Sequence, residues 1–320
     1  MIKDTSKRIW TEEELEELII LKQSGLTWKE INEVFPDQTE NSLRKTYYRK
    51  LNETVHEAPK QDGPKVLLID IETLPLEVFA WGLFDQNVSL EMIKEDWSIL
   101  SFSAKWLGAP EDEIMYFDTR NEENIRNDEK LVRIVHDLMN EADILIHQNG
   151  ERFDVPKLKA RMIKHGLKPP TSFRNIDTMK IMKSTFGFTS NKLAYATELL
   201  CKKYKKLDHS EFSGFKLWSE CLKRNPAAFA SMEKYNKYDV LSLEELFNIL
   251  APWSKGINFQ VFNEDLKDRC SCGSTELEER GFVYTNTAKY QRYVCKNCGK
   301  ESRDSTNLLS KEKRKSLKRL

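Results

Sequence analysis

The run VLLIDIET, residues 66–73, limits the possible folds of this chain more than any other segment. It reads as an apolar strand that ends in two carboxylates, and the side chains of Asp70 and Glu72 point to the same face of such a strand. Ile69 and Ile71 then point to the opposite, buried face. Two carboxylates at the end of an apolar strand repel each other unless a cation lies between them. A D-x-E tripeptide alone, however, also occurs at solvated strand ends.

A second acidic position follows a later apolar run, ADILIH, which is typical of a buried strand. The chain continues through Asn149 into a predicted helix, with Phe153 and Asp154 near its start. A carboxylate there also suits the helix dipole alone, and Asn149 also suits an ordinary turn.

The third acidic position lies in a long helical pattern, residues 226–250. Tyr235 and Asp239 are four residues apart and share one helix face, whereas Tyr238 is one step off that face. Divalent metal ions prefer oxygen ligands, and two ions about 4 Å apart need several carboxylates that converge from different elements. The spacing of these residues therefore favours a two-metal site.

The three segments resemble the motifs of the DEDD exonucleases of ribonuclease H-like fold, in the variant with a tyrosine in the third motif. DIET, N-x-x-x-F-D and Y-x-x-x-D are similar to the exonuclease motifs of family B DNA polymerase proofreading domains and of related free-standing nucleases. The resemblance covers roughly residues 65–250. The histidine variant would need a His where Lys234 stands, and too little chain follows Trp253 for a polymerase palm.

The resemblance implies an autonomous, metal-dependent 3′→5′ exonuclease that binds two Mg²⁺ or Mn²⁺ ions. By it, Asp70, Glu72 and Asp239 hold one ion, and Asp70 bridges to the second. Asp154 supports the second ion partly through water, and Tyr235 orients the attacking water. The predicted substrate contacts beside this site are Asn149, Phe153 and Lys192, although a lysine at a helix start is usually only solvated.

The N-terminal region has large aromatic residues at regular spacing. Trp10, Trp28 and Tyr47 are 18 and 19 residues apart within three short helical patterns, and they resemble a Myb- or SANT-like helix-turn-helix. Suitable N-caps precede the helices at Thr11, Thr27 and Thr39. If this unit binds DNA, the third helix presents four candidate side chains: Asn41, Arg44, Lys45 and Arg49. Its acidic first helix leaves a structural or protein-binding unit as the alternative.

The C-terminal region contains four cysteines in two pairs, each followed by a glycine. Cys270, Cys272, Cys295 and Cys298 resemble a zinc ribbon with one structural Zn²⁺, although the first pair has one intervening residue instead of two. Between the pairs, Lys289 and Arg292 alternate with tyrosines on a predicted hairpin, which suits nucleic-acid contacts. Cys201 and Cys221 lie in apolar helical contexts and are predicted core residues.

The order of these patterns predicts an α/β fold. Strand signals at VLLID, VFAWGLF, SILSFSAKW and IMYF come first, and helices alternate with strands afterwards, which favours a mixed sheet covered by helices. The predicted division of the chain is a helix-turn-helix at 1–52, a linker at 53–64, a ribonuclease H-like exonuclease at 65–253, a zinc ribbon at 266–307 and a basic tail at 308–320.

The balance of 51 basic and 51 acidic residues neither supports nor excludes a nucleic-acid partner, but the basic tail favours one. The start of the chain lacks a signal peptide and no stretch is apolar enough to span a membrane, which predicts a soluble, cytoplasmic protein. DNA is the predicted substrate. The alternatives are a ribonuclease of the same fold, because nothing in the site distinguishes a 2′-OH, and a DNA-binding regulator with an inactive nuclease domain.

Overall fold

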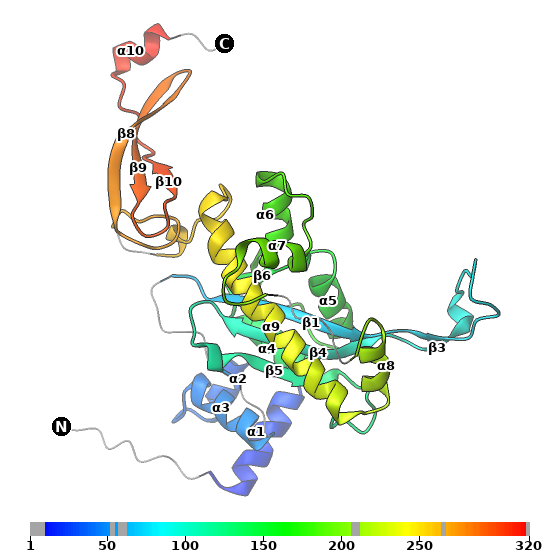
Figure 1. The fold of residues 1–320 in the computed structure, drawn as a ribbon. Helices are drawn as coiled ribbons and strands as arrows, with labels where there is room; N and C mark the ends of the chain where they lie inside the picture. Colours follow the sequence, from blue (N-terminus) through cyan, green and yellow to red (C-terminus); the bar gives the residue numbers. More distant parts are fainter. Residues whose placement is uncertain (1–9, 52–54, 57–62, 206–211, 264–266, 318–320) are drawn as a thin grey trace.

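A computed structural model describes residues 10–51, 55–56, 63–205, 212–263 and 267–317 (Figure 1). Most of the predicted linker at 53–64 lies outside these residues. The central element is a five-stranded sheet in the order β5-β4-β1-β6-β7. Its strands are β1 (Val66–Leu74), β4 (Ser98–Trp106), β5 (Met115–Asp118), β6 (Ile144–His147) and β7 (Arg174–Asp177). Because β1 pairs antiparallel with β4 and parallel with β6, the sheet is mixed, as predicted.

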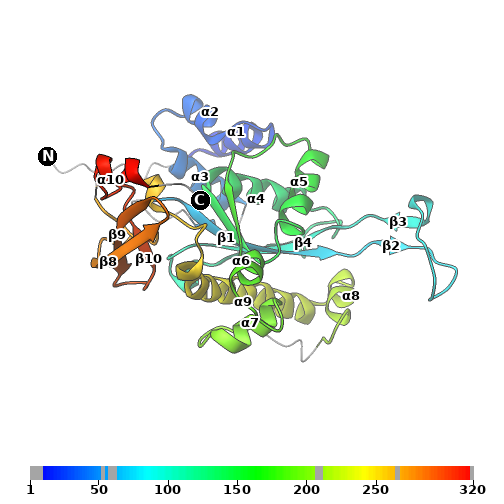
Figure 2. The ribbon, with the colours of Figure 1, turned by 90° about the horizontal axis from the view of Figure 1, so that it is seen from above.

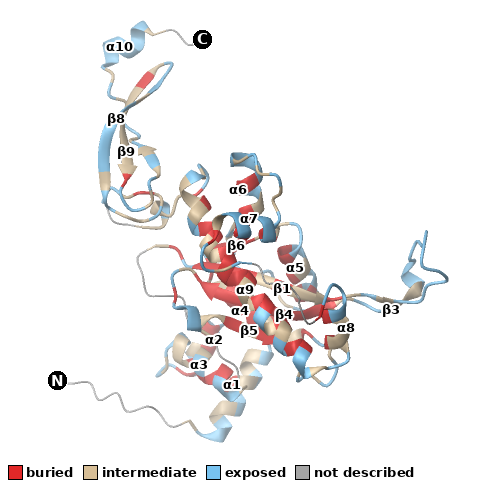
Figure 3. Ribbon diagram, in the orientation of Figure 1, coloured by how far each residue is buried: buried red, intermediate tan, exposed pale blue. Residues whose placement is uncertain are grey.

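Helices cover both faces of this sheet (Figure 2). Alternate residues of β1 divide between the two faces. Leu67 and Ile69 pack into the core with α4 (Glu129–Glu141) and α5 (Asp154–Lys164), whereas Leu68 packs into the core with α6 (Thr178–Thr185), α7 (Leu193–Leu200) and α9 (Pro226–Leu250). Figure 3 shows that the buried residues concentrate in the sheet and in α9. The helix α8 (Lys216–Leu222) also belongs to this domain.

Three helices precede the sheet: α1 (Glu12–Gln23), α2 (Trp28–Val34) and α3 (Glu40–Lys50). The predicted N-caps are confirmed. The hydroxyls of Thr11, Thr27 and Thr39 accept hydrogen bonds from backbone amides three residues later at 3.2, 3.2 and 3.1 Å. Trp28 and Tyr47 meet edge to face, with ring centroids 5.6 Å apart, so aromatic side chains form the small core of this unit.

The C-terminal part is a three-stranded sheet followed by a short helix. Its elements are β8 (Leu277–Thr285), β9 (Ala288–Cys295), β10 (Glu301–Arg303) and α10 (Lys311–Ser316), the last within the predicted basic tail. We call β8–β10 and their four cysteines the cysteine ribbon. Short 3-10 helices lie at Leu90–Met92, Glu111–Glu113, Ala251–Trp253 and Gln260–Phe262.

The predicted strand over VFAWGLF, residues 78–84, is wrong. Only β2 (Glu77–Val78) and β3 (Ile93–Glu95) pair there, as a two-stranded ribbon. The residues between them project away from the sheet and have no apolar surface to pack against (Figure 1). An apolar run forms a core strand only where a sheet edge and a covering layer exist to receive it.

No helix of the described residues is both long enough and apolar enough to cross a bilayer.

Candidate active site and flanking surfaces

The face of β1 that carries Asp70 and Glu72 is the face covered by α9. The hydrophobic side of α9 packs on this face. Asp239 is one of the buried residues of α9, so its side chain faces the strand. One oxygen from each of Asp70, Glu72 and Asp239 can be chosen so that all three lie within 4.8 Å of one another. Three carboxylates at this separation concentrate negative charge in a way that fits a divalent cation.

Tyr235 lies one helical turn before Asp239 and is 8% exposed. Burial raises the pKa of its hydroxyl, and the negative charges of Asp239, Glu72 and Asp70 raise it further. The Tyr235 hydroxyl is therefore close enough to Asp239, Glu72 and Asp70 for their negative charges to act on it. Because its pKa is far above neutrality, the hydroxyl keeps its proton at physiological pH and can donate a hydrogen bond.

Asp154 lies at the first position of α5 and is buried. Its Oδ1 accepts a hydrogen bond of 3.1 Å from the amide of Ile71, which is the residue between Asp70 and Glu72. Burial raises the pKa of Asp154 to about 7, against the effect of its backbone hydrogen bonds. Asp154 therefore joins the site through the backbone of β1, and it is not one of the three carboxylates within 4.8 Å of one another.

A strained turn leads from β6 to Asp154. Asn149 has a φ of 63°, and its amide donates a hydrogen bond of 2.9 Å to Oδ1 of Asp177, which also caps α6. A Cβ on Gly150 would lie 2.4 Å from Cγ of His147, so only glycine fits there. A non-glycine residue with positive φ persists only where its surroundings hold it, which is common at functional sites.

The other predicted substrate contacts lie around this turn. Phe153 is 39% exposed at the N-cap of α5, and Nζ of Lys157 lies 5.2 Å from the centre of its ring. Lys192 is exposed at the N-cap of α7. The side-chain amide of Gln148 donates a hydrogen bond of 2.9 Å to the carbonyl of Asn191, which ties the start of α7 to the turn.

Sequence reasoning missed Asn236, which is fully buried in α9. Its Nδ2 donates a hydrogen bond of 2.6 Å to Oδ2 of Asp70, and its Oδ1 accepts one of 3.4 Å from the hydroxyl of Ser101. The available signal was its position three residues before Asp239, which puts the two side chains on the same side of the helix. The hydrogen bond fixes the orientation of the Asp70 carboxylate.

We expect Asn236→Leu to lower nucleotide release about 10–100-fold, because residues that orient a metal ligand typically contribute this much. The Mg²⁺ concentration for half-maximal rate should rise, which a purely structural role would not cause. Asn248→Leu, an exposed position on the same helix, is the matched control. An unchanged Mg²⁺ midpoint in Asn236→Leu would show that Asn236 does not position Asp70.

The four thiols of the cysteine ribbon also come together. Sγ of Cys270 lies 3.6 Å from Sγ of Cys298, and Sγ of Cys272 lies 3.8 Å from Sγ of Cys295. These separations exceed the 2.05 Å of a disulfide bond, and all four cysteines are free. The glycines after the two pairs, Gly273 and Gly299, have positive φ and close tight turns.

The chemistry of these thiols fits a zinc ion. Burial raises the pKa of the Cys270 and Cys298 thiols, whereas at Cys295 hydrogen bonds from the backbone amides of Cys298 and Asn297 outweigh burial and lower the pKa of the thiol to about 7. Backbone amides that stabilise thiolates are typical of zinc-binding turns. The single residue between Cys270 and Cys272 does not prevent the four Sγ atoms from lying within 4.8 Å of one another.

The third N-terminal helix is docked on α4. Arg44 forms an ion pair with Glu141, and the hydroxyl of Tyr48 donates a hydrogen bond of 2.8 Å to Oδ2 of Asp137. Nζ of Lys22 lies 2.9 Å from the other oxygen of Asp137. Of the predicted DNA contacts on this helix, Arg44 therefore faces the central α/β domain. Lys45 and Arg49 are exposed, and Asn41 is half-buried.

We expect Arg44→Ala to lower the free energy of unfolding by about 1.5–3 kcal/mol, because it removes a charged hydrogen bond to the largely buried Glu141, which keeps only its pairing with Lys65. Arg49→Ala, on the exposed side of the same helix, should leave the melting curve unchanged and weaken DNA binding, with the salt slope reduced by about one. Thermal denaturation and salt titrations of both variants measure this. The reverse pattern would assign the DNA contact to Arg44.

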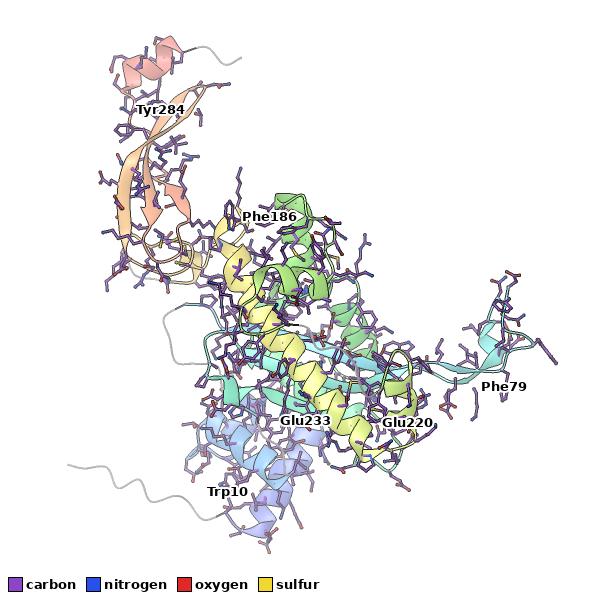
Figure 4. The ribbon with its side chains drawn as sticks, viewed as in Figure 1. Trp10, Phe79, Phe186, Glu220, Glu233 and Tyr284 are labelled. Carbon is purple, nitrogen blue, oxygen red and sulfur yellow. The ribbon has the colours of Figure 1, made fainter. Side chains whose placement is uncertain are left out.

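On the cysteine ribbon, basic side chains stack on aromatic rings. Nζ of Lys289 lies 3.7 Å from the centre of the Phe282 ring, and Nε of Arg292 donates a hydrogen bond of 2.6 Å to the carbonyl of Arg280. Tyr284 is exposed near the hairpin tip (Figure 4). Cationic and aromatic groups on one exposed hairpin are typical of surfaces that contact nucleic acid.

Two family models match parts of this chain. Residues 104–251, which include Asp154, Tyr235 and Asp239, match the family model of the RNase_H superfamily. The central domain is RNase H-like. Residues 10–60 match the family model of the Myb-like DNA-binding domain. The matched range begins after β1, and therefore does not include Asp70 and Glu72. The pairing of β1 with β4 and β6 brings these two residues to the matched part of the sheet.

One similar solved structure is the family B DNA polymerase from the hyperthermophilic archaeon Pyrobaculum calidifontis. It is 16% identical, with a TM-score of 0.42, and the similarity covers 61% of this chain and 26% of the polymerase. No curated protein matches the sequence. The RNase H-like fold supports a nuclease, and the Myb-like unit supports binding to nucleic acid.

Proposed function

We propose that the RNase H-like domain is a divalent-metal-dependent exonuclease that hydrolyses DNA from its 3′ end. The observation that carries this proposal is the convergence of Asp70, Glu72 and Asp239 within 4.8 Å, from a strand and a helix far apart in the sequence. The protonated hydroxyl of Tyr235 beside these carboxylates supports it further. Hydrolysis of a phosphodiester needs oxygen ligands for metal ions and a donor that orients water, and this site offers both.

Asp70, Glu72 and Asp239 would hold one Mg²⁺ or Mn²⁺, and Asp154 would support a second together with Asp70. Divalent ions, when bound, lower the pKa of a coordinated water and stabilise charge on the leaving 3′ oxygen. Tyr235 orients the attacking water through its hydroxyl, and Asn236 keeps Asp70 in position. Asn149, Phe153 and Lys192 contact the terminal nucleotides.

The flanking units hold the substrate away from the metals. In this proposal, residues 1–52 and 266–307 are binding modules around the nuclease at 65–253, and 308–320 is a basic tail. Lys45 and Arg49 on α3, and Lys289 and Arg292 on the cysteine ribbon, contact phosphates. The four cysteines would hold one Zn²⁺, which would stabilise the ribbon. Within the chain, α3 and Lys22 of α1 contact α4, and binding of a separate protein partner is the alternative role of the Myb-like unit.

The test is hydrolysis of matched single- and double-stranded DNA and RNA with Mg²⁺, Mn²⁺ or EDTA, measured as released nucleotide. We expect release from DNA that requires a divalent ion and is absent in Asp239→Asn. Faster release from RNA of the same sequence would make the protein a ribonuclease of this fold. DNA binding without hydrolysis of any substrate would favour a regulator with an inactive nuclease domain.

A further inference from the structure

A groove of about 540 Å³ lies beside the turn that leads to Asp154. We call it the β7 groove. Three separate segments line it: the turn itself at Glu151, the edge strand β7 together with α6, and the residues from Ser254 to Ile257 that follow α9. Its volume is in the range that is typical of ligand sites. The proposed nuclease function assigns no role to this groove.

Three basic side chains line the β7 groove, and all three are exposed: Arg174 at the start of β7, and Lys180 and Lys183 on α6. The guanidinium of Arg174 donates one hydrogen bond to the carbonyl of Gly256. A guanidinium has five N–H donors, so most of them remain available. Neither Arg174 nor Lys183 is paired with a carboxylate of the described residues, and both can therefore receive an anion.

The two acidic residues of the groove are already engaged. Glu151 forms an ion pair with Lys180. Asp177 is buried, and its Oδ1 accepts hydrogen bonds of 2.9 Å from the amide of Asn149 and 3.0 Å from the amide of Met179. Because these carboxylates are occupied by their own partners, they leave the charges of the other two basic residues free to attract a ligand. The groove thus favours a negatively charged occupant.

One end of the β7 groove belongs to the candidate active site. Asp177, which lines the groove, holds the amide of Asn149 in the strained turn. The carbonyl of Asn149 accepts a hydrogen bond of 3.2 Å from the amide of Phe153, the residue next to Asp154. A ligand that leaves the catalytic carboxylates along this turn therefore enters the groove at Glu151.

The other end of the groove reaches the segment on which the cysteine ribbon is docked. Ser254 and Ile257 line the groove, and their carbonyls accept hydrogen bonds of 2.7 and 2.9 Å from Nζ of Lys300 in the ribbon. The ring of Phe186, which ends α6, packs edge to face against Trp253 with centroids 5.8 Å apart (Figure 4). The groove therefore lies between the catalytic turn and the ribbon.

We propose that the β7 groove is the track that single-stranded DNA follows between the catalytic carboxylates and the cysteine ribbon. Arg174 and Lys183 contact consecutive backbone phosphates, and Lys180 exchanges Glu151 for a phosphate when the strand is present. This inference rests on the proposed nuclease function and names the path of its substrate. Contacts to phosphates carry no sequence information, so binding along the groove is independent of base sequence.

The test is the affinity of the full-length protein for single-stranded DNA, measured with Mg²⁺ in the Asp70→Asn background so that no hydrolysis takes place. The double variant Arg174→Gln, Lys183→Gln should raise the dissociation constant about tenfold and lower the salt slope by about 1.4, which is about 0.7 for each lost phosphate contact. The double variant Arg174→Lys, Lys183→Arg keeps both charges and should keep the slope. A purely structural role of the two side chains would not follow charge in this way.

The matched control is Lys164→Gln with Lys168→Gln, because these exposed residues lie at and after the end of α5, which covers the other face of the sheet, and they should leave the affinity unchanged. If the Arg174→Gln, Lys183→Gln variant misfolds, Lys183→Gln alone should lower the salt slope by about 0.7. An unchanged slope in the glutamine variants, or an equal loss in the charge-retaining variant, would overturn the proposal. So would a loss confined to double-stranded DNA.

The groove and the nuclease fail separately, because the binding is measured without turnover. A wild type that hydrolyses no substrate, with a salt slope that still depends on Arg174 and Lys183, would refute the nuclease and keep the groove as a nucleic-acid site. A wild type that hydrolyses DNA, with glutamine variants that bind as tightly as their Asp70→Asn parent, would refute the groove alone.

Discussion

Replacing Asp70 or Asp239 with asparagine should lower nucleotide release at least about 1,000-fold, because each change removes a charged metal ligand that supplies several kcal/mol to the transition state. DNA binding should stay within about twofold, since the basic contacts on α3 and the cysteine ribbon are untouched. Tyr235→Phe should have a smaller effect, about 10–100-fold, because it removes an orienting hydroxyl and no charge. Single-turnover hydrolysis and equilibrium binding measure the two quantities separately.

Asp112→Asn is the matched control for these carboxylates, because Asp112 is exposed in the 3-10 helix Glu111–Glu113 and is not one of the three converging carboxylates, so its substitution should leave the rate unchanged. Hydrolysis by Asp70→Asn within tenfold of the wild type would contradict the assignment. A loss in Tyr235→Phe equal to that in Asp239→Asn would give Tyr235 a structural role.

Removing residues 266–320 should weaken DNA binding and flatten its dependence on salt, while hydrolysis of short oligonucleotides is retained. Affinity falls with salt in proportion to the number of phosphate contacts, because each contact releases counterions. The catalytic side chains all lie between residues 70 and 239, outside the deleted part. Zinc content should fall from about one equivalent per chain to none.

The truncation also removes contacts that dock the cysteine ribbon on the body. Nζ of Lys300 donates hydrogen bonds of 2.7 and 2.9 Å to the carbonyls of Ser254 and Ile257. The double variant Lys289→Gln, Arg292→Gln keeps this docking and the thiols, so it isolates the phosphate contacts. Its zinc content should be that of the wild type, and its salt slope should fall. An unchanged slope in both variants would make the ribbon a structural or protein-docking unit.

Local patterns were enough to predict the elements that carry the site. The period-two pattern of VLLIDIET correctly places Ile69 in the core opposite to the carboxylates, and the four-residue spacing of Tyr235 and Asp239 correctly gives them one helix face. Both predictions depend only on the backbone geometry of one strand or one helix, and the spacing of residue types along the sequence reflects that geometry directly.

Features that depend on tertiary partners could not be predicted. The apolar run at 78–84 reads as a core strand, and only the absence of a covering layer makes it an exposed arm. Arg44 reads as a DNA contact until Glu141, 97 residues away, is placed beside it. Asn236 likewise takes its role from Asp70 on another element. Such pairings are fixed by packing between segments, which no local pattern records.

The most direct test of the proposed nuclease is a time course with single-stranded DNA labelled at its 5′ end, in the presence of Mg²⁺. A 3′→5′ exonuclease should shorten the labelled strand one nucleotide at a time, and Asp70→Asn should leave it intact. With the label at the 3′ end, the first product should be a labelled mononucleotide. Release of the 5′ label as a mononucleotide, internal cuts that appear before terminal ones, or no cleavage at all would contradict the account.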